Sequence, residues 1–280
     1  MTKIGKYIFC AICLYNSSIS SWGGDNFFQG KTYSDRDIPI TTLISFSDRK
    51  IRFEENDFDM NTSTVNEYQY RIDDTSGIRF LEYGTEYDKK MIVIGNKYII
   101  LLYDSDNDYI YKGYKRFGDT LPDLFGFIDF FSTQSSLKER TKNGIKVYGA
   151  ENLSISSLPN PWVEGETGDG IGVEINIDLI KEESSTYYLY FSNGYVSYSR
   201  PDLYKKNNRV KKIRISDNAS DNYIDVTIPD TPDLFKIDIN NVIGLKGMTM
   251  TILEVYPGTI YNDTCINYIG AFISYDGRTH

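Results

Sequence analysis

The sequence predicts an all-β protein, and three observations support this fold class. The chain of 280 residues contains 24 Tyr and 15 Phe but 8 Pro, a composition that suits half-buried pleated surfaces better than helices. Several segments alternate apolar and polar residues with the period of two that a half-buried strand requires. Turn residues separate these segments at short intervals. The length is sufficient for one large domain or two ordinary ones.

Residues 1–20 have the pattern of a secretory signal peptide. Lys3 and Lys6 precede the apolar run YIFCAICLY, and the small polar residues NSSISS follow it. This run is far shorter than the about 20 residues that span a bilayer, whereas a signal peptide has this shape. We therefore expect export, with cleavage after Ser20. A buried N-terminal strand is the alternative, and a lipid anchor on a cysteine of this segment is a weaker one, because bulky residues precede both cysteines.

The charge of the mature chain argues against polyanionic partners. Cleavage after Ser20 would remove two lysines and no acid, which changes the formal net charge from −9 to −11. Phosphate backbones and anionic lipid headgroups repel such a chain. We therefore expect no nucleic acid as a partner and no contact with a membrane. Cleavage would also leave Cys265 as the only cysteine, so an internal disulfide is not expected.

Residues 21–131 are expected to form a small antiparallel β domain. The segment VNEYQYRI (65–72) alternates as a half-buried strand requires, with Asn66, Tyr68, Tyr70 and Ile72 on one face and Val65, Glu67, Gln69 and Arg71 on the other. The runs MIVI and KYIILLY predict a hairpin with a two-residue turn at Gly95 and Asn96. ISFS and IRFE predict a second hairpin with the longer loop DRK. The result is an antiparallel meander, either a small barrel or a curled sheet.

The second half of the chain is expected to be a β-sandwich. LPDLFGFIDFF (121–131) is the one plausible short helix or aromatic plug, and STQSS after it is the best candidate for a domain boundary. Strands then resume at VEINI, YYLYF, VKKIRI, YIDVTI, LFKIDI, MTMTIL and INYIGAFI, with Ile224, Val226 and Ile228 facing inward. Seven or more short strands in about 150 residues are typical of a sandwich or jelly roll.

Two polar or glycine-rich segments are interpreted as turns. GDGIG (168–172) has the glycines of a phosphate-binding loop, but such a loop must open a helix. Here VEINI continues as a strand, so the segment is a bend before a core strand. DSDND (104–108) starts like a calcium-binding loop, which needs Gly at position six and Glu at position twelve. This chain has Tyr109 and Lys115 there, so a polar turn is expected.

Catalytic signals are weak, and we do not expect an enzyme. His280 is the only histidine and the last residue, which excludes histidine-based triads and zinc sites. A carboxylate pair of the glycosidase type is not singled out among 39 acids. A hydrolase of extracellular polysaccharide therefore remains a rival hypothesis. A structural surface protein that contacts other proteins is a third.

The segment NGYVSYSRPDLYKKNNR (193–209) contains the residue types that bind sugars. It interleaves tyrosines, whose rings stack on sugar faces, with Asn and Arg, which bind hydroxyl groups. The alternative is that these tyrosines fill half-buried sheet positions, because Tyr is intermediate in burial. The residues by themselves favour this alternative.

Four motifs in order resemble a known family. They are ENL (151–153), WVEG with GDGIG (162–172), NGY with LYKKNNRVKKIRI (193–215), and ILEVYPGTIYNDTCINYI (252–269). Their order and spacing are similar to those of the NADase-type glycan-binding domain, a discoidin-like jelly roll of the galactose-binding fold. The similarity runs from about residue 132 to 276 and assigns residues 132–280 to this domain. The family is associated with a toxin NAD glycohydrolase, whose catalytic domain has no counterpart here.

The resemblance implies that glycan binds in the loops at one end of the jelly roll. Carried over by motif, the candidate residues are Trp162, Glu164, Asp169, Asn193, Tyr195, Tyr204, Asn207, Asn208, Arg209, Tyr256, Tyr261 and Asp263, with Gly165 and Gly258. Trp162 could serve equally as a core residue beneath the glycine loop or as a sugar platform. The implied function is carbohydrate-binding adhesion, with no cofactor.

Two departures from the family bear on a metal. The family has an acidic DGD loop where this chain has SISSLPNP, and Ser-Glu in its last strand where this chain has Asn267 and Tyr268. In related discoidin-like modules these acids help to hold a structural Ca²⁺. The corresponding residues here are Ile155, Ser157 and Tyr268, and Ca²⁺ requires several oxygen ligands including carboxylates. We therefore expect no metal site.

Overall fold

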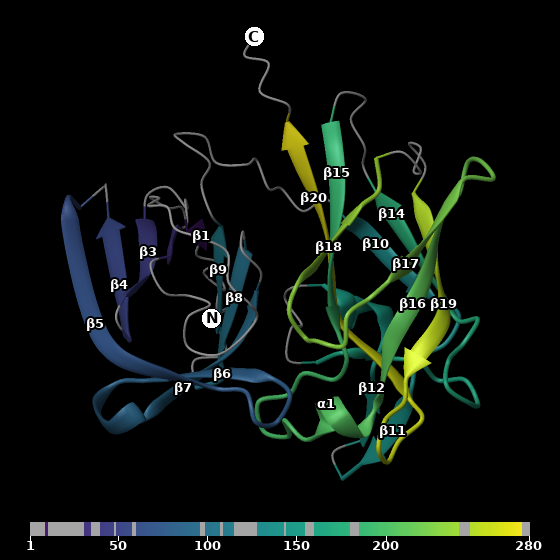
Figure 1. Cartoon of the computed structure of the whole chain (residues 1–280), viewed down its shortest axis with the longest axis horizontal. Helices are drawn as coiled ribbons and strands as arrows, with labels where there is room; N and C mark the ends of the chain where they lie inside the picture. The colour runs from purple at the N-terminus through teal and green to yellow at the C-terminus, as the bar shows by residue number, and fades with distance from the viewer. Residues whose placement is uncertain are drawn as a thin grey trace. The chain divides into compact units, whose positions relative to one another are not determined.

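The computed structural model describes residues 9–10, 31–34, 40–47, 49–57, 60–95, 99–106, 109–114, 128–142, 144–154, 160–179, 185–240 and 247–275. Contacts divide the chain into two compact units, Met1–Thr75 with Arg79–Leu121 and Ser76–Ile78 with Pro122–His280 (Figure 1). This division precedes the boundary at STQSS that the sequence suggests. That the two halves fold as separate domains stays a prediction.

The first unit is an antiparallel sheet that closes on itself. Its strands are β1 (Phe9–Cys10), β2 (Lys31–Ser34), β3 (Ile40–Ser47), β4 (Lys50–Asp57), β5 (Thr62–Asp73), β6 (Arg79–Tyr83), β7 (Lys89–Gly95), β8 (Ile99–Asp104) and β9 (Tyr109–Tyr114). From β2 to β9 each strand pairs with the next, and β9 pairs with both β8 and β2. The predicted meander is confirmed, and it forms the small barrel.

The predicted signal segment is described at Phe9 and Cys10. These two residues form β1, which pairs in parallel with Lys112 and Gly113 of β9. The remainder of residues 1–20 lies outside the described residues. Export with cleavage after Ser20 therefore stays a prediction.

The two predicted hairpins are present, with turns that differ from the prediction. Ser47 pairs with Lys50, so the β3–β4 loop has two residues rather than the three of DRK. Arg49 in this loop has a φ of 62°, as the tightest hairpin turns require. Gly95 pairs with Ile100 and belongs to β7, so the next turn begins after Gly95 rather than at it. Residues 96–98 lie outside the described part of the chain.

The barrel core follows the strand patterns. β5 alternates as predicted, with Tyr68, Tyr70 and Ile72 packed against the core and the residues between them exposed. In β7, by contrast, residues 91–94 are all buried, so both faces of this strand are covered. Burial on both faces explains why MIVI reads as a continuous apolar run rather than as an alternation.

The second unit contains the remaining strands. They are β10 (Ile128–Thr133), β11 (Lys138–Thr141), β12 (Gly144–Val147), β13 (Trp162–Val163), β14 (Glu174–Leu179), β15 (Ser185–Asn193), β16 (Asn208–Asp217), β17 (Tyr223–Thr227), β18 (Phe235–Asp238), β19 (Met248–Tyr256) and β20 (Thr264–Tyr275). All seven strands that the sequence predicts after residue 136 are confirmed. Ile128–Phe131, expected to be a helix or plug, belong to β10 instead. Pairing with β14 and the high β-propensity of aromatic residues explain the difference.

These strands form a sandwich of two layers. One layer has the order β10-β14-β19-β16-β17, and the other has the order β13-β20-β15-β18 (Figure 1). The layers meet where the start of β16 pairs in parallel with the start of β20, at Asn208–Thr264 and Arg209–Cys265. The predicted jelly-roll β-sandwich is therefore confirmed.

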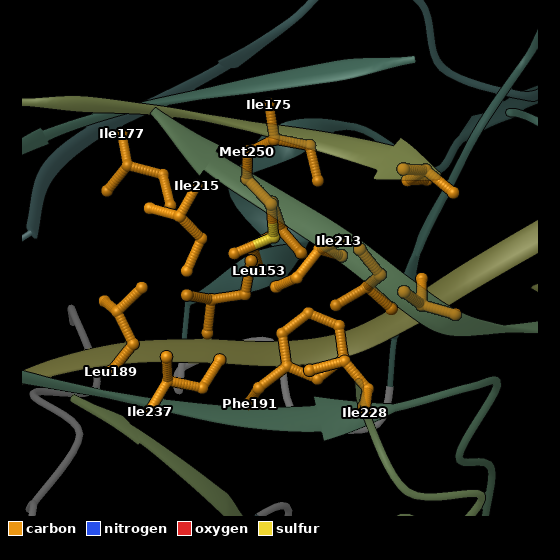
Figure 2. Close-up of a cluster of buried hydrophobic side chains, with 14 of the residues drawn as sticks. Leu153, Ile175, Ile177, Leu189, Phe191, Ile213, Ile215, Ile228, Ile237 and Met250 are labelled. Atoms are coloured by element: carbon orange, nitrogen blue, oxygen red, sulfur yellow. The ribbon is translucent and has the colours of Figure 1, made fainter. Parts of the chain in front are cut away.

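The sandwich core lies between the two layers. Figure 2 shows Ile175, Ile213 and Met250 from one layer pointing toward Leu189 and Phe191 from the other. On β17, Ile224 and Val226 pack against this core and Tyr223 is exposed, as the alternation predicts. The inward faces of both layers thus supply the apolar burial that drives folding.

Helices are few among the residues that the structure describes. The described residues include the α-helix α1 (Leu203–Lys206) and the 3₁₀ helices η2 (Thr85–Tyr87) and η3 (Ala150–Leu153). Within the described ranges, no helix has the length and apolar character needed to cross a membrane.

Candidate functional site

The candidate site is the loop end of the sandwich, where three loops and a hairpin meet. The loops are 165–172 before β14, 194–207 before β16 and 257–263 before β20, and the hairpin is β11–β12. Backbone hydrogen bonds tie them together, from Gly194 N–H to Cys265 C=O and from Asn208 N–H to Asp263 C=O. Leu137 at the base of the hairpin donates to Val163 C=O. Figure 1 shows β11, β12 and α1 at this same end.

Trp162 is a core residue. Its side chain has no exposed surface and packs in the sandwich core beside Leu153. Strand β13 holds it there, because Trp162 pairs with Ile266 of β20. Of the two roles that the sequence left open, the structure supports the core residue, since a fully buried ring offers no face to a sugar.

Glu164 lies beneath the 165–172 loop and is also fully buried. Its Oε2 accepts a hydrogen bond of 2.7 Å from the N–H of Glu166. Burial raises the pKa of the Glu164 carboxyl, hydrogen bonds from the backbone of Glu166 and Thr264 partly offset this rise, and the negative charges of Asp263 and Glu166 add to it. The side chain therefore supports the loop from below.

The glycines of this loop adopt the conformations that the sequence suggests. Gly168, Gly170 and Gly172 have φ values of 126°, 73° and 89°, which side chains disfavour. A Cβ on Gly170 would lie 2.7 Å from Cγ of Glu164, so this position also has no room for a side chain. The interpretation of GDGIG as a bend before a core strand is confirmed, because β14 follows it.

Arg209 fastens the 194–207 loop through a buried network. Its Nε and Nη2 donate to the two carboxylate oxygens of Asp230 at 2.7 and 3.0 Å. Nη1 donates to the carbonyls of Asn207, at 2.7 Å, and Tyr204. Burial alone would lower the pKa of Arg209, but the bonds to Asp230 outweigh it and raise the pKa. Burial raises the pKa of the Tyr204 hydroxyl, which donates to Asp230 at 3.2 Å.

The three asparagines among the candidates also brace the backbone. Asn193 Nδ2 donates to Val210 C=O at 2.7 Å, and Asn193 Oδ1 accepts from Val210 N–H at 2.9 Å. Asn208 accepts from Gly258 N–H and donates to Asn262 C=O, both at 2.6 Å. Asn207 donates to Leu203 C=O at 2.9 Å. All three are buried, so their amides are engaged inside the protein.

Five candidates reach the surface. Tyr261 is 41% exposed, and Asp169, Tyr195, Tyr256 and Asp263 are half-buried. The Tyr256 hydroxyl donates to Ile228 C=O at 3.0 Å. Burial, followed by the charge of Glu139, raises the pKa of Asp263. These five residues, with the exposed Gly165 and the half-buried Gly258, are the candidates that a ligand could contact.

Sequence reasoning missed several residues that build this end. The Tyr195 hydroxyl donates to that of Tyr148 at 3.3 Å, which in turn donates to Glu139 at 3.0 Å. Thr264 Oγ1 donates to Asp169 C=O at 2.6 Å and fixes the 165–172 loop. Asp230 holds Arg209 from 21 residues away. Nothing in the local sequence signals these pairings, because each joins segments that are distant in the chain.

The residues present do not fit the Ca²⁺ site of related modules. Tyr268, where the family has an acid, is buried, and its neighbour Asn267 donates to Ser192 Oγ at 3.1 Å. Ile155 and Ser157 lie outside the described residues. Among the described residues, no three His, Cys, Asp or Glu side chains group as metal ligands.

Comparison with known proteins finds similarity in structure and in a family model. No curated protein sequence matches the chain. An F5/8 type C domain from Bacteroides fragilis is 13% identical, with a TM-score of 0.36, over 55% of this chain and 99% of that chain. A CBM32 domain of a family 31 glycoside hydrolase from Clostridium perfringens is 11% identical, with a TM-score of 0.33, over 52% and 96%.

An arabinofuranosyltransferase from Mycobacteria is 13% identical, with a TM-score of 0.38, and the match covers 53% of this chain but 11% of that one. The family model for the NAD glycohydrolase translocation F5/8 type C domain matches residues 126–271, which is more than half of the chain. The matched range contains the sandwich strands from β10 to β19, the first part of β20 and the whole loop end. The protein therefore belongs to the NAD glycohydrolase translocation F5/8 type C domain family.

Proposed function

We propose that this protein is an extracellular carbohydrate-binding protein that holds glycan at the loop end of its sandwich, and that it is not an enzyme. Two lines of support converge. Domains of the F5/8 type C kind commonly bind carbohydrate, and this chain belongs to such a family. A family named for translocation of a NAD glycohydrolase is also consistent with a location outside the cell.

The observation that carries the proposal is the division of the candidate residues into a buried frame and an exposed rim. Seven of them are buried, and those that form hydrogen bonds do so with other groups of the protein, such as loop carbonyls, rather than with solvent. Tyr261, Asp169, Tyr195, Tyr256 and Asp263 form the rim. A fixed frame reduces the ordering cost when a ligand binds. Rim aromatics and carboxylates are suited to sugar faces and hydroxyl groups.

Tyr261 is the residue expected to contribute most. It is 41% exposed, and an exposed aromatic side chain provides large contact area at low entropic cost. Asp169 and Asp263 lie on neighbouring loops and would accept hydrogen bonds from hydroxyl groups. Adhesion of the protein to glycan-bearing surfaces would follow from this contact.

The test is a glycan array with the purified chain, combined with an assay for reducing-sugar release from any glycan that binds. Binding without release is expected. Tyr261→Ala should weaken binding at least about tenfold, or about 1.4 kcal/mol. The matched control is Tyr223→Ala, because Tyr223 is also exposed (56%) but lies on β17, away from the three loops.

Each other outcome selects a different function. Release of reducing sugar would establish the rival hydrolase of extracellular polysaccharide. The absence of both binding and release would favour a structural surface protein that contacts other proteins. Equal losses in the Tyr261 and Tyr223 variants would contradict the location of the site.

A further inference from the structure

Glu164 is an unusual buried acid. Its side chain has no exposed surface, and its Oε1 has no hydrogen-bond partner, although Oε2 accepts from Glu166 N–H at 2.7 Å. None of the ion pairs formed within the described ranges includes Glu164. The carboxyl therefore lies inside the protein with one of its two oxygens unpaired.

The titratable groups that face Glu164 are all potential anions. Glu166 comes from the 165–172 loop, Asp263 from the 257–263 loop and Cys265 from β20. No cation is among the groups that act on the Glu164 carboxyl. An ionised carboxylate that is buried without a counter-charge is strongly disfavoured, so such a group takes up a proton instead. Backbone N–H groups of Glu166 and Thr264 favour the ionised form, but burial outweighs them, so the pKa of Glu164 is raised.

The 165–172 loop rests directly on this carboxyl. The position of a Cβ on Gly170 lies 2.7 Å from Cγ and 3.1 Å from Cδ of Glu164, which leaves no gap between loop backbone and side chain. Thr264 fixes the loop beside this contact by donating to Asp169 C=O. Ionisation of the buried Glu164 carboxyl would favour contact with water, which a movement of this loop would provide.

We propose that Glu164 is a positioning residue that keeps the 165–172 loop closed while its carboxyl is neutral and releases the loop when it ionises. The loop would then be better ordered in acid than at neutral or alkaline pH. An effect on ligand affinity through Asp169 rests on the proposed glycan-binding function. The ordering of the loop itself does not.

The sign of the pH dependence follows from the raised pKa of Glu164. Because the folded-state pKa exceeds that of the unfolded chain, the stabilisation is fully present below the ordinary Glu pKa of about 4.3. It is lost as the pH rises through the folded-state pKa. Asp263 also has a raised pKa and contributes in the same direction, so it must be controlled separately.

The experiment uses hydrogen exchange of the full chain at several pH values, corrected for the intrinsic pH dependence of exchange. In the wild type, protection of amides in residues 165–172 should fall at least about tenfold from about pH 4 to about pH 8. Glu164→Gln, which is neutral at every pH, should change by less than about twofold over this range. Asp263→Asn should retain the dependence that Glu164 causes.

A second measurement does not depend on how the variant folds. Carboxyl carbon shifts of the wild-type protein, followed by NMR across the same pH range, report the titration of Glu164 directly. A pKa at or below about 4.3 would overturn the proposal. So would loop protection that is equally pH-dependent in wild type and Glu164→Gln. Neither readout involves a sugar, so a failure of the glycan-binding proposal would leave this result intact.

Discussion

Two buried ionisable residues of the loop end, Arg209 and Glu164, differ in how their surroundings treat a charge. The Arg209 side chain donates four hydrogen bonds, two of them to the carboxylate of Asp230, which compensates its charge. The Glu164 carboxyl accepts a hydrogen bond from the backbone N–H of Glu166 and lies near other acids. A partnered buried charge fixes its loop under all ordinary conditions. By our proposal, a buried acid without a counter-charge holds its loop only while it is neutral.

The two loops that Arg209 and Glu164 support, 194–207 and 165–172, are also held by different kinds of contact. The 194–207 loop is bound by side chains that reach its backbone, from Arg209 and Asn207. The 165–172 loop contains three glycines with positive φ. It is supported by contact with Glu164, by a bond from Thr264 to Asp169 C=O, and by bonds from its own N–H groups at both ends, from Gly165 to Ser135 Oγ and from Gly172 to Ile252 C=O. We therefore expect the first loop to be the more rigid of the two.

The largest effect is expected from Arg209→Met. This change removes the bonds to Asp230 and to two backbone carbonyls, and it should lower the free energy of unfolding by about 2–3 kcal/mol. The value is below that of a fully buried pair because the Asp230 side chain is 40% exposed. Chemical denaturation measures it.

Arg214→Met is the matched control for that variant. Arg214 also makes two bonds to an aspartate, Asp225, but both side chains are partly exposed, so a clearly smaller loss than that of Arg209→Met is expected. Equal losses in the two variants would show that burial does not distinguish the two pairs.

A second, smaller effect is expected from Gly170→Ala. The variant acquires backbone strain at a φ of 73° and a clash with Glu164, and it should lose about 2 kcal/mol. Gly172→Ala has a similar φ of 89° but no neighbour within 4 Å, so strain alone should cost about 1 kcal/mol. Thermal denaturation of both variants tests whether the 165–172 loop rests on Glu164. Identical melting temperatures would show that it does not.

The smallest effect is expected from calcium. Millimolar Ca²⁺ or EDTA should leave the melting temperature unchanged, because the acids that hold a metal in related modules are absent at Asn267 and Tyr268. A bound metal would raise the melting temperature by mass action. A rise with Ca²⁺ that EDTA reverses would mean that oxygens elsewhere in the chain bind the ion.

Much of the fold could be predicted from local patterns. The alternation in YIDVTI placed Ile224 and Val226 toward the core, and the four ordered motifs placed the jelly roll. Prediction failed at Ile128–Phe131, where an aromatic run suits a helix or a strand and only pairing with β14 decides between them. It also failed at the β3–β4 turn, whose length depends on the register of Ser47 with Lys50.

The candidate site was less predictable than the fold. The motifs identified the residues that gather at the loop end, but sequence could not tell the frame from the rim. Tyr204 and Tyr261 both lie among turn residues, and yet the first is buried against Arg209 while the second is exposed. Their difference depends on which distant segment covers each ring.

The sequence by itself determined the all-β class, the order of the strands and the glycine bend at 168–172, because these depend on side chains that are neighbours along the chain. The tertiary structure alone decided that β9 closes the barrel, that Trp162 is covered, and that Glu164 is buried without a cation. These features arise where segments far apart in the chain meet. Burial and the local charges there, rather than residue type, fix what each side chain can do.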